Sequence, residues 1–263
     1  MKTAFKISLF GLQDLARSKW IIIYAMFIML VTEGLFQMGG STSKVLLSLM
    51  SFTILMIPLV SIVFGTMHFY NLREFVQLLL TQPIKRETVY LGVFTSLVFT
   101  LSFSYILGVS IPFILHSEFT PQDMSVFYLL LIVGTLLTVI FTGLSFLMAV
   151  IFNDKGKGLG FSLLTWLILS ILYDGVVLYI AYTFHEYPLE KPMIALSMLN
   201  PIDLARVILL LEIDIASLMG YTGAVFERFF GSSLGIWLSL SSMLVWCFWP
   251  VGLGIKLFKV KDF

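Results

Sequence analysis

The chain has 263 residues, of which 59% are hydrophobic and only 12% are charged, and its formal net charge is +1. Soluble domains are roughly half apolar and about a quarter charged, so this composition excludes an ordinary soluble globular protein. We interpret the chain as an integral membrane protein whose small net charge gives no information about its partners.

The first predicted element is an amphipathic helix over residues 4–19, within an N-terminal segment 1–19. Phe5, Leu9 and Leu12 recur at helical spacing, and polar residues occupy another face. The segment lacks the early apolar core and the small-residue cleavage site of a signal peptide. A basic amphipathic helix directly before a span is typical of a helix in the membrane interface. We expect a topology anchor, an elbow helix of a transporter, or both.

Six apolar stretches are long enough to cross a bilayer, which takes about 20 helical residues. They cover approximately 20–38, 46–70, 89–115, 126–152, 159–184 and 234–258. The sequence therefore predicts an all-α integral membrane protein with six transmembrane helices, in which 1–263 form a single membrane domain.

The basic residues are shared unequally between the two sides of this predicted bundle. An even number of spans puts both termini on one side, and 12 of the 16 Lys and Arg residues fall there. The other side holds Lys44, Lys191, Arg206 and Arg228. Since cytoplasmic loops carry the excess of Lys and Arg, we predict cytoplasmic termini and a location in the cytoplasmic (inner) membrane.

The predicted cytoplasmic segment 71–88, between the second and third spans, contains another amphipathic helix. Its apolar face comprises Leu72, Phe75, Val76, Leu79 and Leu80. Arg73, Gln77 and Thr81 recur four residues apart on the opposite edge. Pro83 is predicted to end the helix, because proline disfavours helical geometry in the residue before it. Either the helix lies flat with its leucines in lipid, or its polar edge faces a cytoplasmic partner.

The segment 185–233, between the fifth and sixth spans, is predicted to be an external helical insertion. Its motif Asn200-Pro201-x-Asp203 indicates a helix start. Asn is a favoured N-cap, Pro fits the first turn, and an acidic residue suits the positive helix end. The apolar run 207–211 is too short to span, so it should lie on the membrane or pack against the spans.

Two acidic residues lie within predicted spans, and we predict a transport-pathway role for both. Asp174 lies roughly 22 Å into a hydrocarbon core of about 30 Å. A carboxylate there is costly unless it faces the bundle interior, water or a partner, and a structural hydrogen bond to a neighbouring helix is the alternative. Glu33 lies nearer the interface, towards an outer vestibule. An intramembrane enzyme would need a second group such as His or Lys at the depth of Asp174, and the sequence shows none.

Catalytic and phosphate-binding motifs are absent from the sequence. DKGKGLG, residues 154–160, lacks the spacing of a phosphate-binding loop and is interpreted as a cytoplasmic turn. Met193, Met198 and Met219, with His185, offer a minor alternative as soft metal ligands. Methionine in spans is usually packing material, so we expect no metal and no cofactor bound by this chain.

The order of these elements resembles that of the permease subunits of type-2 ABC exporters. The family pattern of leucines, Ser or Thr, Pro and Arg is matched by Leu78-Leu79-Leu80-Thr81-Gln82-Pro83-Ile84-Lys85-Arg86. The family's acidic pair is reduced to Glu74, and its Gly-Thr is missing. The resemblance implies coupling of this helix to a separate ATPase. The residues implicated in this helix are Glu74, Gln77, Leu78, Leu79, Leu80 and Pro83. Because a permease without a nucleotide site must borrow the energy of ATP hydrolysis, we expect Asp154 and Lys155 of the 153–158 turn to take part as well.

Two further stretches, LLTWLILSILYDGVVL and MLNPIDLARVI, are similar to the NosY family of permeases, which serve maturation of nitrous oxide reductase. The resemblance implies a homodimer with a NosF-like ABC ATPase, which would hold ATP and Mg, and a periplasmic β-helical NosD-like protein. Asn200, Asp203 and Arg206 would mark the helix that meets this periplasmic protein. The complex would assemble the copper–sulfur centre, with sulfur or copper as the transported species. A type-2 exporter of lipid, drug or polysaccharide and a structural anchor of an external complex remain alternatives.

Overall fold

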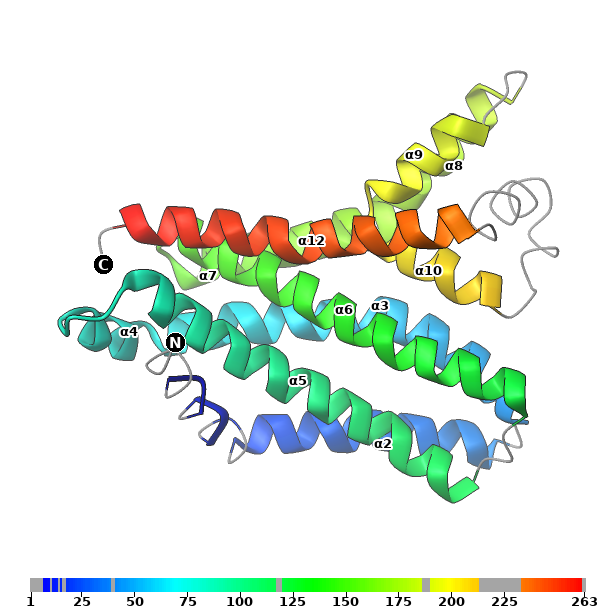
Figure 1. Ribbon diagram of the computed structural model, residues 1–263, viewed down its shortest axis with the longest axis horizontal. Helices are drawn as coiled ribbons and strands as arrows, with labels where there is room; N and C mark the ends of the chain where they lie inside the picture. The colour runs from blue at the N-terminus through cyan, green and yellow to red at the C-terminus, as the bar shows by residue number, and fades with distance from the viewer. Residues whose placement is uncertain are drawn as a thin grey trace.

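The computed structural model describes residues 7–9, 11–13, 15, 18–38, 41–116, 120–185, 190–212 and 233–261. Every regular element within these ranges is a helix, as Figure 1 shows. The elements are α2 (Lys19–Gln37), α3 (Thr42–Asn71), α4 (Arg73–Leu80), α5 (Arg86–His116), α6 (Pro121–Ile151), α7 (Lys155–Leu167), the π-helix η1 (Ile168–Leu172), α8 (Tyr173–Thr183), α9 (Glu190–Met198), α10 (Pro201–Glu212) and α12 (Ser233–Val260).

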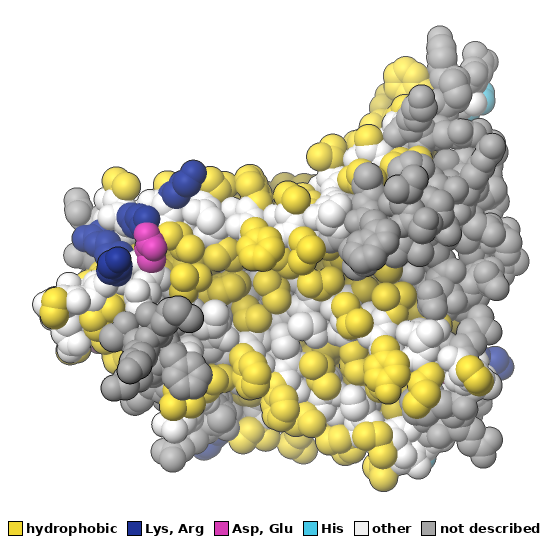
Figure 2. Space-filling view, viewed as in Figure 1, with side chains coloured by type: hydrophobic (Ala, Val, Ile, Leu, Met, Phe, Trp, Pro, Cys, Tyr) yellow, Lys and Arg dark blue, Asp and Glu magenta, His cyan; other side chains and the backbone are white. Residues whose placement is uncertain are grey.

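Six helices in the described part of the chain are long and apolar enough to cross a membrane. They are Lys19–Gln37, Thr42–Asn71, Arg86–His116, Asp123–Ile151, Lys155–Thr183 and Ser241–Val260. The fifth is built from α7, η1 and α8 in succession. Figure 2 shows hydrophobic side chains along the face of the bundle between its ends, as lipid contact requires. The predicted all-α architecture with six spans is confirmed.

Helix α6 lies at the centre of the bundle, where it contacts α3, α5, α7, α10 and α12. It approaches α3 closely through small residues, because a side chain at Gly65 would collide with Ser145. Likewise, a side chain at Gly134 would collide with the ring of Tyr105, whose hydroxyl donates to the Leu130 carbonyl at 3.1 Å. Small residues are the usual means of bringing membrane helices together, since water expulsion gives little attraction in lipid.

Helix α4 has the amphipathic pattern that the sequence predicts. Val76 and Leu79 are buried, and Leu72, Phe75 and Leu80 pack partly against the core. The helix stops before Pro83, as the proline predicts. The helix ends at Leu80, where the Thr81 hydroxyl donates to the Leu78 carbonyl at 2.8 Å, and Pro83 lies in the bend that follows. Of the N-terminal elbow segment, 7–9 and 11–13 are helical, and 1–6 lie outside the described residues.

Helices α9 and α10 form the described part of the insertion between the fifth and sixth spans. The segments Pro192–Met198 and Pro201–Leu209 meet at 110°, as in a broken span or a re-entrant loop. Helix α10 packs against α3, α6 and α12, and Leu204 and Leu209 are fully buried. Within the apolar run 207–211, Leu209 is buried and Val207 and Ile208 pack against the core, which favours the alternative of packing against the spans. Residues 213–232 lie outside the described part of the chain.

Candidate functional sites at one end of the bundle and within the spans

Helix α4 and the turn between α6 and α7 form one surface. Arg73 donates from Nη1 to the carbonyl of Asn153 at 2.9 Å. Lys155 donates from Nζ to Oδ1 of Asn71 at 3.1 Å. The structure thus joins the two segments for which the sequence resemblance implies contact with an ATPase.

The 153–158 turn owes its shape to a helix cap and a glycine. The Asp154 carboxylate accepts a hydrogen bond from the backbone N–H of Lys157 at 2.8 Å and so caps the start of α7. The Tyr70 hydroxyl donates to the carbonyl of Phe152 at 2.7 Å. A side chain at Gly158 would collide with the Tyr70 ring, so the turn packs closely on the end of α3. These contacts explain Gly158 and Asp154 by local structure, although residues 155–158 form the first turn of α7 and only Phe152, Asn153 and Asp154 connect the two helices.

The residues with a predicted coupling role divide into two groups in α4 and the bend after it. Glu74, Gln77, Leu78 and Pro83 are exposed, and Leu78 has 59% of its surface accessible. Leu79 is only 9% accessible, and Leu80 is half-buried against the core. Leu79 and Leu80 therefore pack α4 against the rest of the bundle, and the exposed residues form a surface that is accessible to a partner.

The end of α12 reaches the same surface, a contact that the sequence analysis missed. Arg86 donates from Nη1 to the carbonyls of Lys259 at 2.9 Å and Lys261 at 2.7 Å. Lys261 in turn donates to the carbonyl of Val150, Glu87 forms an ion pair with Lys259, and burial lowers the pKa of the Lys261 ammonium. Figure 2 shows the resulting cluster of basic side chains at one end of the molecule. The contacts of Arg86 and Glu87 with the end of α12 join residues more than 170 positions apart, so no local sequence pattern predicts them.

Asp174 is paired with an arginine from another helix. Its Oδ2 lies 2.9 Å from Nη2 of Arg206, and Nη1 of the same guanidinium lies 3.2 Å from Oδ1 of Asp203. The side chains of Asp174 and Arg206 are 33% and 34% accessible, whereas that of Asp203 is 11% accessible. One cation between two carboxylates satisfies the requirement that an acid within a span have a partner. We name Asp174, Asp203 and Arg206 the charge cluster.

Asn200 fixes α10 to the π-helical turn that precedes Asp174. Its side chain is fully buried, and its Nδ2 donates to the carbonyl of Leu169 at 2.7 Å. Its Oδ1 accepts from the backbone N–H of Ile202 at 3.0 Å, which confirms the predicted N-cap. A π-helical turn interrupts the regular hydrogen-bond ladder of a helix and is common at functional positions. The amide of Asn200 is therefore used within the chain, and docking of a partner through this residue stays a prediction.

Glu33 belongs to a different part of the molecule. Its carboxylate accepts a hydrogen bond from Gln37 at 3.2 Å and lies 3.5 Å from Nδ1 of His116 at the end of α5. Helices α2 and α8 lie on opposite sides of the bundle (Figure 1). The structure therefore does not bring together the two residues that the sequence assigns to a transport pathway.

The described residues include no group of three or more His, Cys, Asp or Glu side chains placed to hold a metal. Met193 is buried on α9, His185 is exposed, and Met219 lies outside the described residues. The cation beside Asp174 is an arginine, which stays protonated in proteins and so cannot exchange a proton with this carboxylate.

A search of curated proteins found no match to the chain. The model of a family described as ABC-2 family transporter protein matches residues 11–263, nearly the entire length. The six candidate spans fit this match. The chain therefore belongs to the ABC-2 transporter family and is a multi-pass membrane permease of an ABC transporter.

Proposed function

We propose that this permease receives the energy of ATP hydrolysis through a surface formed by α4 and the α6–α7 turn. Membership of an ABC family implies an ATPase partner, which would hold ATP and Mg. The observation that carries the proposal is the hydrogen-bonded junction of Arg73 with Asn153 and Lys155 with Asn71. Because of it, a force applied at the exposed residues Glu74, Gln77 and Leu78 reaches α3, α6 and α7 together.

The proposal extends to a homodimer in the inner membrane that serves maturation of the copper–sulfur centre of nitrous oxide reductase. Family membership alone fits equally well an exporter of lipid, drug or polysaccharide. The stretches around Asp174 and Asn200, which are similar to the NosY family, favour the maturation role. These same stretches hold the Asp174–Arg206 pair and the Asn200–Leu169 hydrogen bond. In this proposal a NosF-like ATPase meets α4, and a NosD-like periplasmic protein meets the opposite end of the bundle.

The charge cluster has a defined place in this mechanism. Asp174 belongs to the fifth span, and Asp203 and Arg206 belong to α10, so the cluster links a span to the broken helix pair. A movement begun at α4 and carried along α7 would stretch or shift this ion pair. Asp174 and Glu33 are proposed to take part in transport at two separate positions in the bundle, and α10 to transmit the change to the periplasmic partner through Asn200, Asp203 and Arg206.

A pull-down of the tagged full-length protein from its native membranes tests both parts of the proposal, the coupling to an ATPase and the maturation role. We expect the wild type to retain an ABC ATPase and a periplasmic β-helical protein. The Leu78→Arg variant should lose the ATPase and keep the periplasmic protein, because Leu78 is exposed at the α4 surface. Leu79 is a poorer probe, since an arginine at this buried position would disturb folding.

Leu78→Met is the matched control, because it keeps the apolar contact area and should retain both partners. Retention of the ATPase by a folded Leu78→Arg variant would contradict coupling through α4. Capture of an ATPase without any periplasmic β-helical protein would instead support the general exporter.

A further inference from the structure

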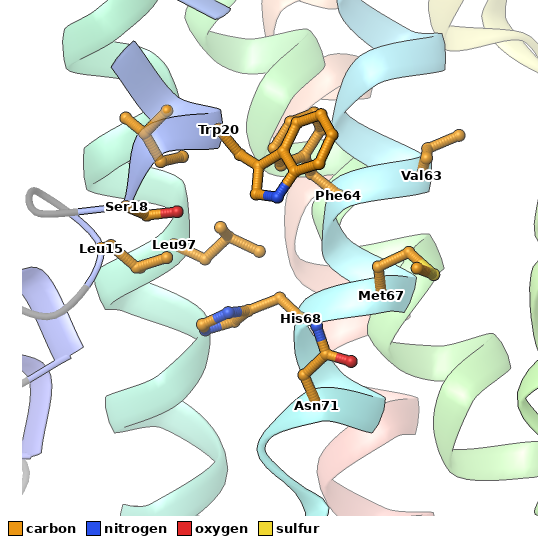
Figure 3. Close-up of a pocket in the computed structure, with 10 residues that line it drawn as sticks. Leu15, Ser18, Trp20, Val63, Phe64, Met67, His68, Asn71 and Leu97 are labelled. Atoms are coloured by element: carbon orange, nitrogen blue, oxygen red, sulfur yellow. The ribbon is translucent and has the colours of Figure 1, made fainter. Parts of the chain in front are cut away.

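A cavity of about 370 Å³ lies at the end of the bundle where α4 is found. Figure 3 shows it between the start of α2, the last turns of α3 and the neighbouring face of α5. Its walls are mostly apolar, with Trp20, Phe64 and Leu97 among them. Its volume falls within the range of roughly 300–1,000 Å³ typical of pockets for small ligands.

Three polar side chains interrupt this apolar lining. They are Ser18, His68 and Asn71 (Figure 3). His68 also borders a second cavity of about 210 Å³, which is lined by Leu72 and by Phe75 of α4. The two cavities therefore share the His68 side chain, and the larger one borders the start of α2 whereas the smaller one borders α4.

We propose that the larger cavity binds one acyl chain of an anionic phospholipid from the surrounding membrane. Trp20 is 69% exposed at the rim, and an exposed tryptophan at the end of a span is typical of the membrane–water interface. Val63 and Met67 are only half-buried, so the cavity opens towards the surface that lipid covers. An acyl chain fits the apolar walls, and the interfacial position places its headgroup beside Ser18.

The basic charge at the rim of the cavity favours an anionic headgroup. Lys19 is exposed, follows Ser18 directly, and forms no ion pair among the described residues. The same end of the bundle carries the basic cluster around Arg86 and Lys259. Basic side chains at the membrane surface attract anionic lipids by about 1 kcal/mol each. A phosphatidylglycerol-type headgroup therefore complements the rim better than a zwitterionic one.

A lipid bound here would act on the proposed coupling surface. Helix α3 continues into α4 through the single residue Leu72, and Phe75 reaches back to the second cavity. Filling the larger cavity would fix the last turns of α3 and hence the position of α4. This consequence depends on the proposed function, whereas the lipid site itself does not.

Photo-crosslinking in lipid nanodiscs tests the site with the full-length protein. The probe is phosphatidylglycerol with a photoactivatable group in its acyl chain, compared with phosphatidylcholine carrying the same group. We expect cross-links concentrated on residues 63–71 and the start of α2, and more of them with phosphatidylglycerol. Met67→Trp, which fills the cavity, should reduce these cross-links several-fold. Lys19→Gln should remove the preference for phosphatidylglycerol and leave the chain in place.

The matched control is Met26→Trp, the same substitution at a position that is 56% exposed on α2 and outside the cavity. It should leave the cross-links unchanged. Labelling spread evenly over the exposed helices, or labelling unaffected by a folded Met67→Trp variant, would overturn the proposal. If Met67→Trp does not fold, equal cross-linking of both lipids to wild type and Lys19→Gln would overturn it as well. The readout requires no ATPase, so its failure is distinct from a failure of coupling.

Discussion

At the scale of single residues, the stability of the charge cluster depends on one cation, Arg206, which two carboxylates share. Arg206 lies 2.9 Å from Asp174 and 3.2 Å from Asp203, and both carboxylates are at least two-thirds buried. Removing Asp174 leaves Arg206 paired with Asp203, a neutral arrangement. Removing Arg206 leaves two neighbouring carboxyl groups without a counter-ion, and they must either repel each other or take up a proton, both of which cost free energy.

We therefore predict unequal losses of stability from the two sides of this ion pair. Arg206→Met should lower the free energy of unfolding by about 2–3 kcal/mol, somewhat below the 3–5 kcal/mol of a fully buried pair because the side chains are partly accessible. Asp174→Asn should cost about 1 kcal/mol or less, since the amide can still accept a hydrogen bond from Arg206. Thermal unfolding of the purified variants in detergent measures both.

The double variant Asp174→Asn with Arg206→Met separates charge from packing. It carries one uncompensated carboxylate in place of two, so it should be more stable than Arg206→Met alone. Equal losses in the two single variants would contradict a shared cation and would reduce the cluster to two independent surface contacts.

At the scale of elements, the π-helix η1 and the N-terminus of α10 are a single structural unit. One side chain, Asn200, donates to the carbonyl of Leu169 in η1 and accepts from the first turn of α10. The Tyr173 hydroxyl adds a hydrogen bond to the carbonyl of Leu196 at 2.6 Å, which ties α8 to α9. The irregular turn and the bent helix pair therefore support each other.

Substitutions of Asn200 should show a graded effect. Asn200→Ser keeps an oxygen for the cap but loses the hydrogen bond to Leu169, so we expect a loss of about 1–2 kcal/mol. Asn200→Ala loses the cap as well and should cost about 1 kcal/mol more. Unfolding midpoints measure the series. The control Asn71→Ala removes only an exposed hydrogen bond to Lys155 and should change stability by less than about 0.5 kcal/mol. Equal losses for the serine and alanine variants would show that the cap contributes nothing.

The sequence predicts elements that follow from local chemistry and misses those that depend on tertiary packing. The spans and the amphipathic α4 follow from runs and spacing of apolar residues, and the start of α10 at Asn200 follows from capping preferences. The burial of α10 could not be predicted in the same way, because the same pattern of apolar residues suits a helix face that contacts lipid and one that contacts protein. The sequence assigns Arg206 to docking of a periplasmic partner, and no local pattern identifies it as the ion-pair partner of Asp174. Only the bend between α9 and α10 brings Arg206 towards the fifth span.

At the scale of the whole molecule, the distribution of basic residues distinguishes the two ends of the bundle. Helix α2 begins, α3 ends, α5 begins and α12 ends at the same end of the bundle as α4 (Figure 1). The described basic residues of that end are Lys19, Arg73, Lys85, Arg86, Lys155, Lys157, Lys256, Lys259 and Lys261. Lys44 lies in the first turn of α3, at the opposite end. Because short loops rich in Lys and Arg stay in the cytoplasm, we predict that the α4 end faces the cytoplasm.

Labelling of single cysteines in intact cells checks this orientation. The chain's own cysteine, Cys247, is buried, and Cys247→Ser supplies a background free of thiols. In that background, Lys44→Cys should react with a membrane-impermeant maleimide from outside, whereas Gln82→Cys should react only after the membrane is permeabilised. Both positions are exposed, so the difference reports the side of the membrane and not burial. Reaction of Gln82→Cys in intact cells would put α4 outside, where a cytoplasmic ATPase cannot reach it, and would contradict the coupling proposal together with the orientation.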